Sequence, residues 1–97
     1  MLTFNDLRNN RRNEILSLAA RHGAHHLRVF GSIARGEQNE SSDLDLLVSW
    51  DPGRDLFDHV ELKEDLQDLL GVKVDVVTDK TLHWYIRDRV LAEARPL

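Results

Sequence analysis

Phe30-Gly31-Ser32-Ile33-Ala34-Arg35-Gly36 and, shortly after it, Ser42-Asp43-Leu44-Asp45-Leu46 are the two most informative segments of the chain. Residues 26–30 alternate in part and end at Gly31, so they predict a short strand that enters a tight turn. A short helix is expected over residues 33–35. The first stretch therefore predicts a strand, a turn and a helix in close succession.

The second stretch predicts a second strand. From Asp43 onward the pattern has a period of two residues, which is typical of a strand with two different faces. Leu44, Leu46, Val48 and Trp50 share one face, whereas Asp43, Asp45, Leu47 and Ser49 share the other. Residues 36–42 are wholly polar and predict an exposed loop between the two stretches.

The remaining chain predicts helices that alternate with short strands. Thr3 and Asp6 have the spacing of a capping box, which predicts a helix over about residues 4–22. The other expected elements are a helix over 56–70 closed by Gly71, a strand over 72–77, and a helix containing Leu82, Ile86 and Val90 that Pro96 would stop. This alternation predicts an α/β layer structure.

Length and composition limit the class of protein. The 97 residues, of which 41% are hydrophobic and 31% charged, predict one globular domain over residues 1–97. There is no cysteine, and no apolar run approaches the roughly 20 residues of a membrane span, so we expect a cytoplasmic protein without membrane contact. The net charge of −4 disfavours direct nucleic-acid binding.

Asp43 and Asp45 form the first candidate for catalysis. They are two residues apart on a predicted strand, so their Cα atoms are about 6.6 Å apart and their side chains project from one face. Hard cations such as Mg²⁺ prefer oxygen ligands and are usually held by one or two carboxylates together with substrate phosphates. The pair therefore predicts a metal site, and two ions would stabilise both oxygens of a phosphoryl displacement.

Asp75 is the candidate for a third carboxylate. It shares a strand face with Lys73 and Val77, whereas Val74 and Val76 point toward the hydrophobic layer. Aspartate has a low propensity for strands and is costly to bury without a partner, so the position of Asp75 among valines indicates function. Asp75 would complete the site if its strand lies beside that of Asp43 and Asp45.

Gly31, Ser32 and Arg35 are the candidates for nucleotide binding. Glycine at position 31 lets the backbone pass close to a ligand, and the amide and hydroxyl of Ser32 can bind phosphate oxygens. Arg35 lies about one helical turn after Ser32. Its planar guanidinium suits either the same phosphates or an aspartate, and the sequence does not choose between these two partners.

The order Gly-Ser, Arg-Gly, Ser-Asp-x-Asp-Leu and a later strand aspartate resembles the minimal nucleotidyltransferase (MNT) family of the DNA polymerase β superfamily. The resemblance covers about residues 27–77. It implies a small α/β fold with a mixed sheet and flanking helices, Asp43, Asp45 and Asp75 as ligands of two Mg²⁺ ions, and Asp75 as a possible proton acceptor. It further implies a phosphate-binding turn at Gly31 and Ser32, and ATP as the substrate whose AMP is transferred.

The same resemblance implies a partner. Small MNT proteins commonly accompany a HEPN-family ribonuclease toxin, and some silence it as antitoxins by attaching AMP to its tyrosine. We therefore expect a protein adenylyltransferase of this kind. Two alternatives stay open: an antitoxin that masks the toxin by binding alone, and a nucleotidyltransferase for an RNA or small-molecule acceptor.

Several other features have ordinary structural interpretations. The arginines at positions 8, 11 and 12 are expected on a solvated helix face, and the five histidines are scattered along the surface. Residues 56–70 are expected to cover the sheet of this chain. Trp84 and Tyr85, with Arg87 and Arg89 nearby, suit either a core or solvent role or a contact with a partner or a base.

Overall fold

The sheet has four strands and the mixed topology expected of the fold class. The computed structural model describes all 97 residues. The strands are β1 Ala24–Phe30, β2 Leu44–Trp50, β3 Val74–Val77 and β4 Arg95–Pro96, in the order β3-β2-β1-β4. β2 and β3 are parallel, whereas β1 is antiparallel to both of its neighbours.

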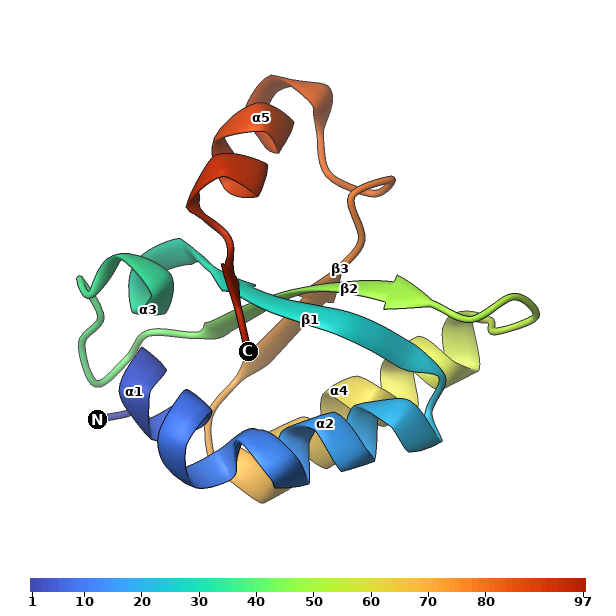
Figure 1. The fold of residues 1–97 in the computed structure, drawn as a ribbon, viewed down its shortest axis with the longest axis horizontal. Helices are drawn as coiled ribbons and strands as arrows, with labels where there is room; N and C mark the ends of the chain where they lie inside the picture. Colours follow the sequence, from blue (N-terminus) through green and yellow to red (C-terminus); the bar gives the residue numbers. More distant parts are fainter.

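Two helical segments cover one face of this sheet (Figure 1). The first comprises α1 Phe4–Asp6, a π-helical turn Leu7–Arg11 and α2 Arg12–Arg21, so the single helix predicted for residues 4–22 contains a π-helical interruption. The second is α4 Leu56–Leu70, as predicted. The capping box of Thr3 and Asp6 is confirmed. Eighteen buried apolar residues form the core between helices and sheet. No helix combines the length and apolarity needed to cross a membrane.

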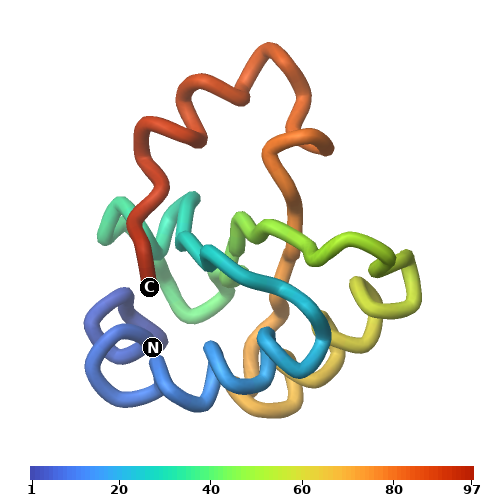
Figure 2. The backbone as a smooth tube through the Cα atoms, turned by 45° about the vertical axis from the view of Figure 1, so that its right-hand side comes forward, coloured from blue at the N-terminus to red at the C-terminus, as the bar shows by residue number.

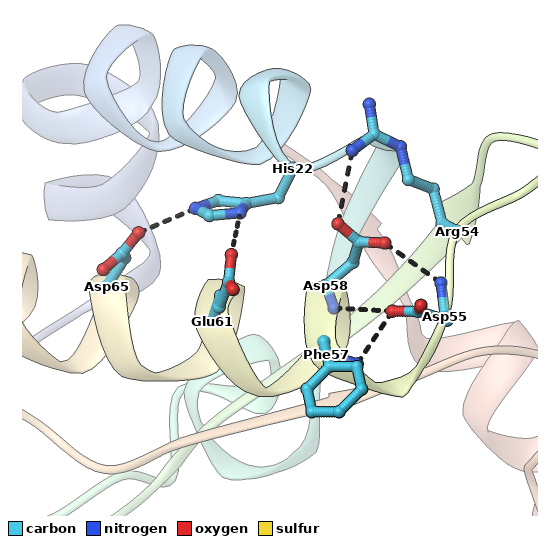
Figure 3. A network of polar contacts seen from close by, with 7 residues as sticks. All are labelled: His22, Arg54, Asp55, Phe57, Asp58, Glu61 and Asp65. Carbon is cyan, nitrogen blue, oxygen red and sulfur yellow. Dashed lines mark hydrogen bonds and ion pairs between the residues drawn. The ribbon is translucent and has the colours of Figure 1, made fainter.

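Polar contacts connect the helices of this layer (Figure 3). His22, at the end of α2, lies 2.7 Å from Asp65 and 3.7 Å from Glu61 on α4. Asp55 caps α4 by accepting hydrogen bonds from the amides of Phe57 and Asp58. The His22 contacts hold α2 beside α4, and the Asp55 cap fixes the start of α4, on the side of the sheet opposite the candidate site.

The other face of the sheet is covered only in part, by α3 Gly31–Arg35 and α5 Trp84–Glu93 (Figures 1 and 2). Leu47 and Val90 are buried here, with 0% and 3% of their surface exposed, and they lie outside the main core. Leu47 shares a strand face with Asp45, as predicted, but unlike Asp43 and Ser49 it is fully buried.

The C-terminal strand is the element that the sequence did not predict. α5 ends at Glu93, and Arg95–Pro96 then pairs with Arg28 and Val29 at the edge of the sheet. Proline is tolerated there because an edge strand need not donate on its outer side. Two residues carry too little pattern for a strand to be inferred, and Pro96 indicated only the end of a helix.

The N-terminal arginines lie on a helix face where Arg8 and Arg12 are exposed, as expected, but their guanidinium groups also make hydrogen bonds that the sequence did not predict. The guanidinium of Arg8 donates to the carbonyl of Pro96 at 3.3 Å, and that of Arg12 donates to the carbonyl of Leu97 at 2.8 Å. Arg11 donates to the carbonyl of Leu69 at 3.0 Å. These side chains bind carbonyl groups that helical ends and the edge strand would otherwise leave to water.

Candidate active site

The sheet register brings Asp45 and Asp75 side by side. The two residues are direct partners in the parallel pair of β2 and β3, and Asp45 is also opposite Phe30, the last residue of β1. The predicted neighbourhood of the two strands is confirmed. Val74 and Val76 are buried in the main core, so Asp75 projects from the opposite face, which α3 and α5 cover only in part.

Gly31 lies directly against the Asp45 carboxylate. Its φ of +76° is in the left-handed region, which glycine adopts without strain. A Cβ atom built on Gly31 would collide with Oδ2 of Asp45. Glycine is therefore required here for two reasons, the backbone conformation and the space that the carboxylate occupies. The turn between β1 and α3 consequently brings Ser32, the following residue, close to the acidic site.

Asp45 is the member of the acidic group whose ionised form is disfavoured by its surroundings. Burial, the largest cause, together with the negative charges of Asp75 and Asp43 raises its pKa from an ordinary value of 3.8 to about 6. Arg35 opposes this effect, although less strongly. Asp43 and Asp75 are exposed. Negative charge thus accumulates at a half-buried carboxylate with two exposed carboxylates nearby, an arrangement that a bound cation would relieve.

Arg35 binds two glutamates in this structure. Its guanidinium donates to Glu93 on α5 at 2.9 Å and to Glu37 at 3.0 Å. These hydrogen bonds raise the pKa of Arg35 above its usual value, Glu93 having the larger effect. The sequence proposed a phosphate or an aspartate as the partner. Glu93 was missed because it comes from a helix 58 residues away in the chain, and no local pattern indicates that contact.

The carboxylates supply the oxygen ligands that Mg²⁺ prefers, but they do not surround a metal ion by themselves. No three histidine, aspartate or glutamate side chains converge closely enough to hold a metal ion by themselves. This arrangement fits Mg²⁺, because that ion keeps several waters and takes the remaining oxygens from substrate phosphates. Asp43, Asp45 and Asp75 are the residues that could hold it. Gly31 and Ser32, predicted from the sequence to bind the phosphates, lie in the turn beside Asp45.

The acidic site is also open to solvent. Four surface cavities are present, and none of them is lined by Asp43, Asp45 or Asp75. Small-molecule sites are usually concave and enclose most of their ligand. This chain therefore presents its carboxylates on an uncovered part of the sheet, where a large acceptor has room to approach.

Comparison with known proteins gives matches over nearly the whole chain. A family model described as nucleotidyltransferase domain matches residues 13–97. The protein adenylyltransferase MntA of Thermococcus cleftensis is 38% identical over 93 residues, which are 96% of this chain and 94% of the relative. A Methanocaldococcus jannaschii protein, provisionally named a protein adenylyltransferase, is 42% identical over 83 residues, covering 86% of this chain and 89% of its own.

Solved structures agree with this result. A structure provisionally named a minimal nucleotidyltransferase is 54% identical, has a TM-score of 0.85, and is matched over 99% of this chain and 97% of its own. More distant matches share the fold alone. One is a toxin–antitoxin pair with AMP-PNP, which is 24% identical, has a TM-score of 0.73 and is matched over 87% of this chain and 69% of its own. Another is a tri-AMPylated Shewanella oneidensis HEPN toxin with its MNT antitoxin, which is 21% identical, has a TM-score of 0.64 and is matched over 87% of this chain and 66% of its own.

The family match, the strand aspartates and the Gly-Ser turn agree with one another. The carboxylates and the turn come together on one face of the sheet, as the motifs predicted, and the fold is that of the solved relative. The chain belongs to the nucleotidyltransferase domain family and is a minimal nucleotidyltransferase enzyme.

Proposed function

We propose that this enzyme transfers AMP from ATP to a tyrosine hydroxyl of a HEPN-family ribonuclease toxin, and that it thereby acts as an antitoxin. The observation that carries the proposal is the open acidic site, in which Asp45 and Asp75 are register partners beside the Gly31 turn. A protein acceptor suits a site that no cavity encloses. The absence of cysteine agrees with action in the cytoplasm.

The related proteins support the choice of nucleotide and acceptor. The Thermococcus relative is named a protein adenylyltransferase and aligns over nearly its full length. Two structures with the same fold are complexes of an antitoxin with its toxin, one containing AMP-PNP and the other a HEPN toxin that carries AMP groups. These names favour ATP over other nucleotides and a protein over a small molecule.

In the proposed reaction, an acceptor oxygen forms a bond to the α-phosphorus of ATP while the bond from that phosphorus to the β-bridging oxygen breaks. Pyrophosphate leaves, and the proton of the acceptor hydroxyl passes to Asp75. Asp43, Asp45 and Asp75 would hold Mg²⁺, which when bound supplies positive charge that stabilises phosphate oxygens. Gly31 and Ser32 would orient the phosphate tail. Most of the rate enhancement would then come from positioning and charge.

Arg35 has a conditional role in this proposal. Its guanidinium is engaged by Glu37 and Glu93, so it can bind a phosphate only by exchanging one of these partners. Both glutamates are anionic acceptors, as a phosphate is, so they compete with a nucleotide for the N–H donors of the Arg35 guanidinium. We propose that ATP draws Arg35 from Glu37, the residue of the exposed loop.

The test is intact-mass spectrometry of a HEPN-family ribonuclease from the same gene pair, incubated with this enzyme, ATP and Mg²⁺. We expect an AMP-sized gain of mass on the ribonuclease, and none with the double variant Asp43→Asn/Asp45→Asn. Tight binding without a gain in mass, combined with full neutralisation by the double variant, would replace the proposal with a masking antitoxin. Labelling of an RNA or a small molecule in place of the ribonuclease would redirect it to another acceptor.

A further inference from the structure

A cavity of about 560 Å³ lies at the end of the sheet where β2 and β3 begin. Figure 1 shows α1, α3 and the start of β2 together at this end of the molecule. Ile33 lines the cavity and directly follows Ser32 in the chain, and Ser42 lines it and directly precedes Asp43. Because consecutive Cα atoms are about 3.8 Å apart, the cavity borders both the Gly-Ser turn and the first aspartate. We call it the α1–β2 cavity.

Part of the lining comes from the π-helical turn of the N-terminal helix. Asn10 and Arg11, the last two residues of that turn, line the α1–β2 cavity. Single π-helical turns inside a helix are rare and frequently lie at functional sites. Arg11 already donates to Glu14 and to the carbonyl of Leu69, whereas the side chain of Asn10 is exposed and has no hydrogen bond within the chain. The amide of Asn10 is therefore available to a ligand.

The chemistry of the lining favours an uncharged ring over a phosphate. Five of the eleven lining residues are hydrophobic, and two others, Asp6 and Glu40, are carboxylates that would repel a phosphate. The one cation of the lining is Arg11, whose donors are engaged. Small-molecule sites have mostly apolar walls and a few polar groups that fix orientation, within about 300–1,000 Å³. The α1–β2 cavity thus suits a nucleobase, which has two apolar faces and a polar edge.

The amide of Asn10 indicates which base the cavity would accept. A carboxamide has an acceptor oxygen beside an amino group with two donors. Adenine presents the complementary pair, an amino donor beside a ring nitrogen that accepts, so asparagine and adenine form two hydrogen bonds. Guanine presents two acceptors at the same edge, which suits arginine instead. An asparagine in this lining therefore favours ATP over GTP.

We propose that the α1–β2 cavity is the nucleobase site of this enzyme, in which Asn10 hydrogen-bonds the edge of adenine while the α-phosphate lies at the acidic site. This inference rests on the proposed function, because it takes ATP as the substrate. Three residues separate Ser42 from Asp45, about 10 Å along the strand, and the ribose and α-phosphate bridge that interval. A base held at the end of the sheet leaves the open face of β2 and β3 free for a protein acceptor.

The first test compares Asn10→Leu with a matched control, Asn9→Leu, from the same π-helical turn. Both side chains are exposed, but Asn9 does not line the cavity. Titration calorimetry measures the binding of ATP, GTP and inorganic tripolyphosphate, each with Mg²⁺. We expect Asn10→Leu to weaken ATP binding about fivefold or more and to abolish the preference for ATP over GTP, because a bidentate amide contact discriminates between bases to this degree. Tripolyphosphate should bind equally to all three proteins, and Asn9→Leu should match the wild type throughout.

A photoaffinity label locates the base directly. Under ultraviolet light, 8-azido-ATP loses N₂ and its purine ring becomes attached to a neighbouring side chain. We expect the label in peptides that contain the lining segments 1–11, 39–42 or 70–72. Excess unlabelled ATP should prevent the labelling.

The outcomes separate this inference from the proposed function. Equal ATP affinity of Asn10→Leu and the wild type would overturn the inference, as would an equal loss of tripolyphosphate affinity or a label confined to other segments. Transfer of AMP to the ribonuclease is measured independently by the gain in mass. A wild type that is labelled in the α1–β2 cavity but transfers no AMP refutes the proposed function alone, whereas transfer of AMP with the label elsewhere refutes the inference alone.

Discussion

Replacing Asp45 by asparagine is expected to stabilise the metal-free protein although it removes a residue of the acidic site. Burial raises the pKa of Asp45 from 3.8 to about 6, with Asp75 and Asp43 contributing to the shift. The ionised carboxylate is therefore disfavoured in the folded state. An asparagine side chain has nearly the same shape and carries no charge, so it removes this penalty at neutral pH.

The size of the effect follows from the shift. One pKa unit corresponds to about 1.4 kcal/mol, so a shift of about 2 units corresponds to about 3 kcal/mol. Asp45 is only half-buried, and solvent screening reduces this value. We expect the variant to raise the free energy of unfolding by about 1.5 kcal/mol at pH 7, which for a domain of this size is about 6–12 °C in Tm.

The pH dependence has a defined sign. Between about pH 4 and pH 6 the folded state of the wild type binds more protons than the unfolded state does, because the pKa of folded Asp45 is raised. The contribution of Asp45 to stability therefore falls as pH rises through this window and stays low above it. The difference between variant and wild type should be small near pH 4 and largest at pH 7.

The assay is thermal unfolding followed by circular dichroism, in EDTA, from pH 4 to pH 8. Other carboxylates titrate in the same range, but they are common to both proteins and cancel in the difference. Asp43→Asn is the matched control, and it should change the free energy of unfolding by less than about 0.5 kcal/mol because Asp43 is exposed. A variant at Asp45 that melts at or below the wild-type temperature at pH 7 would refute the reasoning.

Three further predictions use the same structure. Gly31→Ala should lower the free energy of unfolding by at least about 1–2 kcal/mol, since φ is +76° and the new Cβ would collide with Asp45. Gly36→Ala is the control, because φ is +73° there but the space around the position is free. Equal melting temperatures of the two variants would contradict the collision. Asp55→Ala should cost about 1 kcal/mol through loss of the α4 cap, as measured by urea unfolding, while AMP transfer persists. Chelation by EDTA should abolish AMP transfer without lowering Tm, and an unchanged rate of transfer in EDTA would exclude Mg²⁺ from the mechanism.

Much of the site could be predicted from local pattern. The period-two alternation around Asp45 and Asp75 correctly assigned each aspartate to the face away from the hydrophobic core, because successive strand residues point in opposite directions. The Gly-Ser turn was found for a similar reason, since glycine marks a backbone conformation that other residues avoid. The roles of these residues in metal and nucleotide binding stay predictions.

Other features depend on contacts between distant parts of the chain. The partner of Arg35 on α5, the edge strand at Arg95–Pro96 and the hydrogen bonds of Arg12 all join segments more than 50 residues apart. Neither hydrophobic periodicity nor helix capping carries information about such pairings. The sequence left a core or solvent role and a contact with a partner or a base open for Trp84, and the structure leaves its side chain exposed.

Apart from β4 and the π-helical turn, the order of the helices and strands, the faces of β2 and β3 and the three candidate aspartates could be inferred from local pattern, because these follow from the periodicity and conformational preference of neighbouring residues. The contact of Asp45 with Gly31, its place beside Asp75, its raised pKa and the absence of these aspartates from any cavity depend instead on the folded arrangement. Burial and electrostatic repulsion are properties of distances in space, which a linear pattern does not contain.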